Sequence, residues 1–378
     1  MQATQTAFDA LWNSLAPIGR DPATGGVNRL PWTPAELACR DWFRAAADAR
    51  SLAVEQDRNG NLWAYWGDPD APELVVTGSH LDSVVDGGAY DGALGVVCAF
   101  AAVDALRDSG AQPVRPVAVV SFNEEEGARF GRACLGSKLL TGALDPAEAS
   151  ALRDDDGLRL CDVADCDFGA EPERVARIAA FVEVHVEQGR QLDGPLGVAD
   201  EISPHGRYRF DFTGDANHAG TTPLALRRDP MLDFARATLA ARESAERHGG
   251  LATFGRVHVE PNITNAIPSL VRAWLDVRAA DEQTVDSIVR DLGDKPVRES
   301  WTPAVTFDAA LREHVHAPTL STAAGHDAAI LQDAGVPSTM IFVRNPTGIS
   351  HAPGEHAERD DCLVAVDALA TILRELAC

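Results

Sequence analysis

The chain carries little positive charge. Its 33 Lys and Arg residues are outnumbered by 57 Asp and Glu residues, which gives a formal net charge of -24 over 378 residues. Nucleic acid and anionic membranes are therefore not expected as partners, because their phosphates would be repelled. The overall charge says little about small substrates, which respond to the local field of a binding site.

Paired cysteines and long apolar runs are also missing. The seven cysteines are scattered, no C-x-x-C occurs, and the closest pair is Cys161 and Cys166. This spacing is typical of a reducing compartment and not of a disulfide framework. Met1 to Pro17 lacks a basic start followed by an apolar core, so no signal peptide is expected. No apolar stretch approaches the ~20 residues that span a bilayer. We therefore expect a cytoplasmic protein.

The length and the 45% hydrophobic content predict a globular protein of about two domains. Leu52–Trp66 is typical of a hairpin that turns at residues 59–61. Beyond it, short apolar runs alternate with helical patterns. Strands are predicted at 74–77, 117–122 and 180–187, and helices at 93–107 and 133–141. The alternation predicts an α/β domain with helices around a mainly parallel sheet.

The pattern changes near residue 206. Predicted elements then run strand, helix, strand, strand, helix, strand, at 208–212, 230–247, 255–259, 271–277, 281–292 and 305–307. This order is the split βαβ pattern of a small α+β, ferredoxin-like domain. Residues 318–378 return to helix, strand and helix. We therefore expect a larger domain formed by residues 1–205 and 317–378, interrupted by a smaller domain at 206–316.

Acidic residues and histidines follow the predicted strands of the larger domain. They are His80, Asp82, a Gly-rich loop with Asp91, the run Glu124–Glu126, His185 within a strand, and His351 near the end. Ligands gather beyond the carboxyl ends of parallel strands. Imidazoles and carboxylates without a nearby thiolate pair suit two divalent cations that share a carboxylate and activate water. The sequence therefore predicts a metal-dependent hydrolase.

Taken one at a time, these motifs leave alternatives open. His80 and Asp82 face the same side of a strand, where Asp82 could accept the second imidazole N–H of a metal ligand, or the pair could cap the strand end. Glu124–Glu126 could supply a ligand and a general base, or start an exposed helix. The acidic stretch 145–175 is typical of a solvated surface.

The smaller domain offers further candidates with the same ambiguity. His218 could donate to a developing oxyanion, or lie in a surface loop. Asn265 and Arg278 could together hold a carboxylate, whereas Arg278 alone could form a surface ion pair.

Taken together, the motifs resemble the amidohydrolase branch of the M20 metallopeptidase family, which includes allantoate amidohydrolases, N-carbamoyl-L-amino acid hydrolases and β-ureidopropionases. The resemblance covers nearly the whole chain. It rests on residues 25–30, 78–82, 87–95, 122–130, 184–189, 217–223, 261–268, 325–328 and 348–355.

The resemblance implies a role for each matching residue. One metal would be held by His80, Asp91 and His185, and the other by Asp91, Glu126 and His351, with Asp91 bridging. Glu125 matches the general acid/base and Asp82 a further catalytic position, while Gln188, His218, Asn265 and Arg278 match substrate-binding positions. The ions would be Mn²⁺ or Zn²⁺, with Co²⁺ or Ni²⁺ as alternatives. His218 is expected to reach the site of a partner subunit, which implies a homodimer with a dimerisation domain at 206–316.

The implied activity is hydrolysis of a ureido C–N bond in a small carboxylate, allantoate or an N-carbamoyl amino acid, by a metal-bridging hydroxide with Glu125 as acid and base. An aminoacylase or dipeptidase on the same scaffold is the alternative enzyme, and His185 with Gln188 argues against it. A non-catalytic metal-binding homologue is the alternative outside enzymes, and the intact ligand set argues against that. The segment Ile202–Arg209 has no assigned role, Arg344 is a candidate substrate contact, and His326 is expected to be structural.

Overall fold

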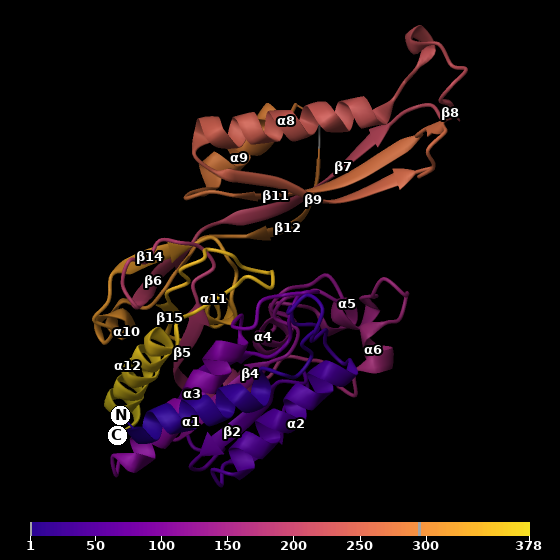
Figure 1. Cartoon of the computed structure of the whole chain (residues 1–378). Coiled ribbons are helices and arrows are strands. Elements are labelled where there is room, and N and C mark those ends of the chain that lie inside the picture. The colour runs from indigo at the N-terminus through magenta and orange to yellow at the C-terminus, as the bar shows by residue number, and fades with distance from the viewer. Residues whose placement is uncertain (1, 294–295) are drawn as a thin grey trace. The chain divides into compact units, whose positions relative to one another are not determined.

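The computed structural model describes residues 2–293 and 296–378. The chain divides into two compact units (Figure 1). The larger unit runs up to Asp200 and resumes at Thr306, and the smaller unit is Glu201–Val305. From the sequence, the smaller domain was expected to span residues 206–316.

The larger sheet has nine strands in the order β1-β2-β4-β3-β5-β15-β6-β13, with β14 beside β6. The central neighbours β4, β3, β5 and β15 are parallel, and the pairs β1–β2, β2–β4 and β15–β6 are antiparallel. The strands are β1 Ala53–Gln56, β2 Leu62–Trp66, β3 Leu74–His80, β4 Val117–Phe122, β5 Ile178–Val186, β6 Leu196–Ile202, β13 Val305–Thr306, β14 Thr319–Thr322 and β15 Ser338–Val343.

The central strands are buried along their whole length. Every residue of β3, β4 and β15 is buried, as expected for runs rich in Val and Ile that are covered on both faces. The helix α3 packs on β3 and β5 and against α1 and α12. The helices are α1 Gln2–Leu15, α2 Pro34–Asp48, α3 Ala93–Asp108, α4 Leu135–Thr141, α5 Pro146–Ala151, α6 Leu160–Val163, α7 Pro172–Arg177, α10 Ala309–Glu313, α11 Asp327–Asp333 and α12 Arg359–Ala377.

The smaller unit is an antiparallel sheet in the order β12-β7-β11-β9, against which α8 and α9 pack (Figure 1). Its buried core includes Phe210, Leu275 and Ile288. The smaller unit also contains a two-stranded antiparallel ribbon formed by β8 and β10. The elements are β7 His205–Thr213, β8 Asn217–His218, a short 3-10 turn Leu224–Leu226, α8 Pro230–His248, β9 Leu251–Glu260, β10 Ala266–Ile267, β11 Leu270–Arg278, α9 Glu282–Asp291 and β12 Val297–Thr302.

The predicted fold class is confirmed: a mainly parallel sheet with helices, and a separate small α+β unit. One predicted strand was assigned to the wrong sheet. The fourth strand of the smaller sheet is β12, whereas Val305–Thr306, predicted for that place, forms β13 of the larger sheet. The sequence of β12, VRESWT, is polar because it is an edge strand with half or more of its residues exposed, so its alternation is weak.

The acidic stretch 145–175, expected as a solvated surface loop and helix, contains helices and also contributes apolar side chains to a core. It contains α5, α6 and part of α7, and its apolar residues Ala149, Leu160 and Phe168 pack with Leu135 and Leu139. Its Asp154 accepts a hydrogen bond from Arg129 at 3.1 Å.

Of the helices in residues 2–293 and 296–378, none combines the length and the apolar composition needed to cross a membrane.

Candidate metal centre

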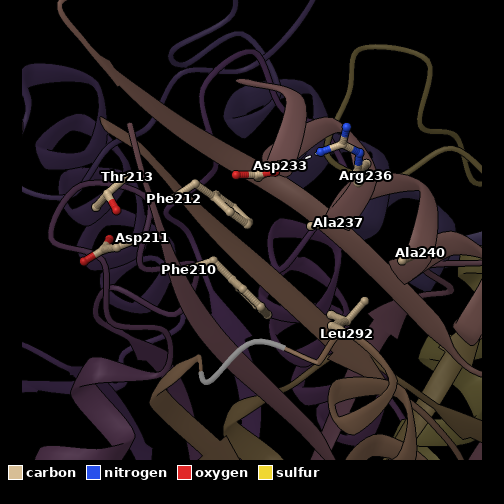
Figure 2. Close-up of a pocket in the computed structure, with 9 residues that line it drawn as sticks. All are labelled: Phe210, Asp211, Phe212, Thr213, Asp233, Arg236, Ala237, Ala240 and Leu292. Atoms are coloured by element: carbon tan, nitrogen blue, oxygen red, sulfur yellow. Dashed lines mark hydrogen bonds and ion pairs between the residues drawn. The ribbon is translucent and has the colours of Figure 1, made fainter. Parts of the chain in front are cut away.

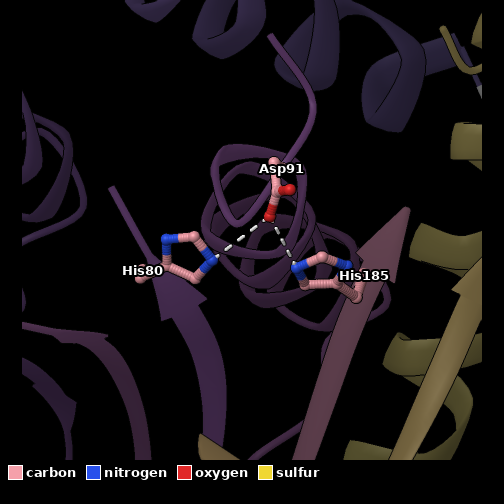
Figure 3. A group of neighbouring side chains, drawn as sticks. All are labelled: His80, Asp91 and His185. Atoms are coloured by element: carbon pink, nitrogen blue, oxygen red, sulfur yellow. Dashed lines mark ion pairs between the residues drawn. The ribbon is translucent and has the colours of Figure 1, made fainter. Parts of the chain in front are cut away.

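The carboxylate of Asp91 lies between two imidazoles (Figure 3). His80 is the last residue of β3, His185 lies near the end of the neighbouring parallel strand β5, and Asp91 lies in the loop that leads into α3. Asp91 Oδ1 is 3.4 Å from His80 Nε2 and 3.1 Å from His185 Nε2. All three side chains are buried. The parallel register therefore brings together residues that are far apart in the sequence.

The other oxygen of Asp91 faces a second group. Asp91 Oδ2 is 3.5 Å from His351 Nε2, which is in turn 3.4 Å from Glu126 Oε2. Glu126 follows β4, and His351 lies in the loop after β15, with half of its side chain exposed. Both groups hold their candidate ligand atoms within 4.8 Å of one another. One carboxylate is thus shared by two sets of ligands.

The donor atoms are suited to cations. His80 Nε2 and Glu126 Oε1 are buried and have no hydrogen-bond partner. The other ring nitrogens lie against backbone oxygens, His80 Nδ1 3.1 Å from Asp82 O and His185 Nδ1 2.8 Å from Val186 O. A Nδ1–H that donates to a carbonyl leaves Nε2 as the acceptor that a metal would use. His185 Nε2 accepts the backbone N–H of Gly92 at 3.3 Å. The residues present therefore fit divalent ions.

The electrostatics of the metal-free site point the same way. Burial alone would lower the pKa of His185, but hydrogen bonding to Asp91 and its charge outweigh burial and raise this pKa to about 9. Burial, together with Asp91 and Glu125, raises the pKa of Glu126 well above its usual value. The clustered carboxylates therefore place excess negative charge at this site, which bound cations would neutralise.

Asp82 acts differently from the hydrogen-bonding role that its H-x-D spacing predicted. Its carboxylate Oδ1 is 3.6 Å from His80 Nδ1, while its backbone oxygen is the closer partner. The two carboxylate oxygens instead accept the backbone N–H groups of Glu125 and Glu126, each at 3.1 Å. The chain leaves the strand after His80, so the alternation of side chains no longer applies. Asp82 thereby fixes the acidic turn that follows β4.

The three consecutive glutamates point in different directions. Glu124 is buried and accepts the backbone N–H of Phe130 at 3.0 Å, and burial raises its pKa to about 8. Glu125 is in neither ligand group; its Oε2 lies 3.7 Å from His80 Nε2 and its Oε1 accepts from Cys134 Sγ at 3.5 Å. Glu126 faces His351. Of the three glutamates, Glu125 is the one whose carboxylate lies beside His80 without belonging to a candidate ligand group.

Two residues of the centre were given no catalytic role from the sequence. Glu355 is buried, and its Oε1 accepts the backbone N–H groups of Tyr90 and Asp91 at 2.9 Å each. His326 is buried beside His185, with ring centroids 4.4 Å apart, and neither of its ring nitrogens has a hydrogen-bond partner. The motifs around both were visible in the sequence, but nothing in them showed that the chain would place them beside Asp91 or His185.

A glycine makes the approach of the ligands possible. Gly92 has a left-handed φ of +62°, and a Cβ there would lie 2.4 Å from the ring of His80. Any other residue would be strained and would displace the imidazole.

The predicted substrate residues fall into three places. Gln188 lies at the centre, where its Nε2 donates to Asp91 Oδ2 at 2.9 Å. His218 and Asn265 are neighbours in the smaller unit, since Ala219 N donates to Asn265 O at 2.9 Å. Arg278 ends β11 and donates to both carboxylate oxygens of Asp276, at 2.6 and 3.1 Å.

Arg278 and the His218 loop lie at opposite ends of the smaller sheet. The ribbon with Ala266 and Ile267 precedes β11, whose nine residues separate it from Arg278 by roughly 26 Å. One copy of the smaller unit therefore does not bring all predicted substrate residues together.

Arg344, the candidate substrate contact, is paired with residues of the larger unit. Its Nε donates to Asp361 Oδ2 at 2.9 Å, and its Nη1 donates to Asp193 O at 3.0 Å. The segment Ile202–Arg209 includes the end of β6 and the start of β7, where the chain enters the smaller sheet.

The smaller unit also has a hollow of about 590 Å³ along β7 and α8 (Figure 2). Phe210 and Phe212 lie at its floor, and Asp233 pairs with Arg236 at 3.0 Å on α8. None of the predicted site residues lines it.

Comparison with known proteins agrees with these features. The model of Peptidase family M20/M25/M40 matches residues 76–375. The chain belongs to this family. Within it, the chain is 33% identical to an N-carbamoyl-L-amino acid amidohydrolase of Geobacillus stearothermophilus over 98% of each chain, and 33% identical to an allantoate amidohydrolase of Escherichia coli (strain K12) over 96% of each.

Solved structures give the same placement. The crystal structure of an amidase of the hydantoinase/carbamoylase family from Burkholderia vietnamiensis matches with a TM-score of 0.90 and 29% identity, covering 99% of this chain and 97% of that one. The resemblance to the amidohydrolase branch of the M20 family is thereby confirmed.

Proposed function

We propose that the protein hydrolyses the ureido (carbamoyl) C–N bond of a small carboxylate, allantoate or an N-carbamoyl-L-amino acid. The observation that carries this proposal is the shared carboxylate of Asp91, whose two oxygens face separate ligand groups, with Glu125 beside them. The names of the relatives support the substrate class, since they act on N-carbamoyl-L-amino acids and allantoate.

Two divalent ions would be held by the two groups. His80, Asp91 and His185 would bind one, and Asp91, Glu126 and His351 the other. When bound, such ions polarise a carbonyl oxygen and lower the pKa of water. Imidazole and carboxylate accept Mn²⁺, Zn²⁺, Co²⁺ or Ni²⁺, and the affinity order alone does not choose among them.

Glu125 would move the protons. It accepts one from the attacking water and returns it to the leaving nitrogen, while Asp82 holds its backbone in place. Burial raises the pKa of Glu125 to about 7, with His80 opposing the rise and Asp82 and Asp91 adding to it. A carboxyl group whose pKa lies near neutral pH can both accept and return a proton. The products are ammonia, carbon dioxide and the freed amine.

Substrate would be held by Gln188, His218, Asn265 and Arg278. The Arg278 guanidinium suits a carboxylate and the His218 imidazole suits a developing oxyanion. Because His218 and Arg278 lie at opposite ends of one sheet, we infer a homodimer in which His218 serves the site of the partner subunit. The smaller domain, residues 206–316 in the sequence-based division, would then act as the dimerisation domain and lid of the catalytic domain.

The surface of the smaller unit supports this assembly. Leu232 and Leu239, seven residues apart on α8, are 56% and 66% exposed. Leu251 and Val257, on the edge strand β9, are also exposed. Exposed apolar side chains beside an unpaired strand edge are typical of a surface that a second chain covers.

Ammonia release tests the activity. The purified protein is stripped with chelator, reloaded with Mn²⁺ or Zn²⁺, and offered allantoate, several N-carbamoyl-L-amino acids, N-carbamoyl-β-alanine and a dipeptide, with amine release followed for the dipeptide. We expect metal-dependent turnover of one ureido compound. Cleavage of the dipeptide alone would identify an aminoacylase or dipeptidase instead, and no turnover of any compound would indicate a non-catalytic homologue.

Complementation tests the homodimer. Glu125→Gln and His218→Ala chains are each expected to be inactive alone. Mixed after dissociation, they should recover about a quarter of the wild-type activity, because half of the dimers are mixed and each has one complete site. No recovery from chains that sedimentation shows to have mixed would contradict a His218 that serves the partner.

A further inference from the structure

The side-chain amide of Asn345 is the most heavily bonded polar group near the candidate metal centre. Asn345 follows β15 and is 0% exposed. Its Oδ1 accepts from Thr347 N at 3.1 Å, Thr347 Oγ1 at 2.8 Å and Gly348 N at 3.1 Å. Its Nδ2 donates to Ile349 O at 2.8 Å and to Glu187 O at 3.1 Å. One side chain thus organises the turn that leads to His351 and also binds a second loop.

That second loop carries Gln188. Glu187, whose carbonyl Asn345 binds, comes directly before Gln188 and donates its own N–H to Val343 O at 2.8 Å. Gln188 Nε2 lies 3.5 Å from His351 Nε2 and 2.9 Å from Asp91 Oδ2. The amide therefore joins the loop of His351 to the segment that carries Gln188.

The His351 loop is held at two points: by Asn345 before His351, and after it by Glu355, whose Oε1 accepts the backbone N–H groups of Tyr90 and Asp91. His351 and Ile349 are 50% and 44% exposed, in contrast to the fully buried His80 and His185 of the other group. Correct placement of an exposed ligand depends on the anchor of its loop, because outer-shell partners orient metal ligands.

We propose that Asn345 is a positioning residue that holds His351 against Asp91 and Glu126, so that the second ion of the centre depends on its amide while the first does not. The inference rests on the two-ion centre of the proposed function. Loss of the amide should lower the affinity for the second ion about 10- to 100-fold, the range found when outer-shell partners of metal ligands are mutated.

Two substitutions separate the functions of the amide. Asn345→Asp keeps oxygen acceptors for Thr347 and Gly348 but loses the donors to Glu187 O and Ile349 O, so it tests the link between the loops. Asn345→Ala removes all of the bonds. The exposed His351→Ala gives the reference for loss of the ligand itself. Asn59→Ala is the matched control, because Asn59 is also 0% exposed and its amide joins Gly169 N and O at 2.9 Å each.

The measurement is calorimetric titration of the metal-free, full-length proteins with Mn²⁺ alone, repeated with Zn²⁺, with thermal melting to confirm the fold. The wild type and Asn59→Ala should bind two ions per chain. Both Asn345 variants should bind one ion with wild-type affinity and the other 10- to 100-fold more weakly. His351→Ala, which lacks the ligand itself, should weaken binding of that ion at least as much. With saturating metal, the Asn345 variants should regain turnover, which a misfolded site would not.

The outcomes distinguish this inference from the function on which it rests. Asn345 variants that bind both ions as the wild type does would overturn the inference alone. Equal weakening in Asn59→Ala would also overturn it, since the effect would belong to any buried amide. A wild-type chain that binds fewer than two ions would remove the two-ion centre of the proposed function, and the inference with it.

Discussion

Replacing Glu125 with glutamine should lower the catalytic rate without destabilising the fold. The change is nearly isosteric and removes only the capacity to accept a proton. Glu125 belongs to neither ligand group, so the metal stoichiometry should stay the same. A positioned general base contributes about 10²- to 10⁴-fold to a rate, so we expect kcat to fall by that factor, which is about 3 to 5 kcal/mol in the barrier.

The same substitution should stabilise the metal-free protein at alkaline pH. In the folded chain, burial and the neighbouring acids raise the pKa of Glu125 from 4.5 to about 7, against the opposing effect of His80. A raised carboxyl pKa means that folding favours the protonated carboxyl. The contribution of Glu125 to folding stability is therefore fully present below pH 4.5 and is lost as the pH rises through 7. At pH 8 the ionised group costs up to about 3 kcal/mol, and glutamine avoids this cost.

The assays are ammonia release with saturating metal, and urea unfolding of chelator-treated protein at pH 5 and pH 8. Turnover of Glu125→Gln close to that of the wild type would refute the assignment of the base. A variant that is less stable than the wild type at pH 8 without metal would refute the electrostatic reasoning.

Three further predictions follow from the same geometry. Chelation should abolish turnover and lower the melting temperature, because ions at a hundred times their Kd stabilise by about 2.7 kcal/mol per site; scanning fluorimetry before and after adding back Mn²⁺ checks this, and an unchanged melting temperature would contradict it. Gly92→Ala would place a Cβ 2.4 Å from the His80 ring at a residue with a φ of +62°. It should lower metal affinity at least about tenfold and lower the free energy of unfolding by about 1–3 kcal/mol; metal titration curves like those of the wild type would show that the loop adapts. Arg236→Ala should leave turnover within about twofold, since surface ion pairs contribute little and the hollow beside Phe210 holds no residue of the centre; a larger loss would give that hollow a role in the reaction.

Periodicity and composition were sufficient for the architecture because the central strands are buried on both faces. A strand such as β15 is buried at every residue, and its run Met340–Val343 is therefore continuously apolar, which leaves a clear pattern. Edge strands carry no such requirement. The polar β12 was therefore missed, and the short β13 was placed in the smaller sheet although it pairs in the larger one.

The residues proposed as ligands could be named from the sequence, because their side-chain types suit divalent cations and their motifs resemble those of a known family. The sequence could not say how they meet. That His80 and His185 share one oxygen of Asp91, while His351 faces the other, follows from the register of β3 and β5 and from the path of three loops.

The supporting groups required the tertiary structure altogether. Asp82 accepts backbone N–H groups more than forty residues away, and Glu355 does so for the loop of Asp91. Hydrogen bonds between side chains and distant backbone leave no periodic trace in a sequence.

The sequence by itself determined the α/β class, the inserted smaller domain, the family and the set of candidate ligands, because these depend on burial and side-chain chemistry at positions along one chain. Only the tertiary structure decided that Asp82 binds the backbone of the acidic turn, that Arg344 is held by Asp361, and that Arg278 and His218 lie at opposite ends of one sheet. Such relations depend on distances between segments, which are fixed by packing and strand register and not by the order of residues.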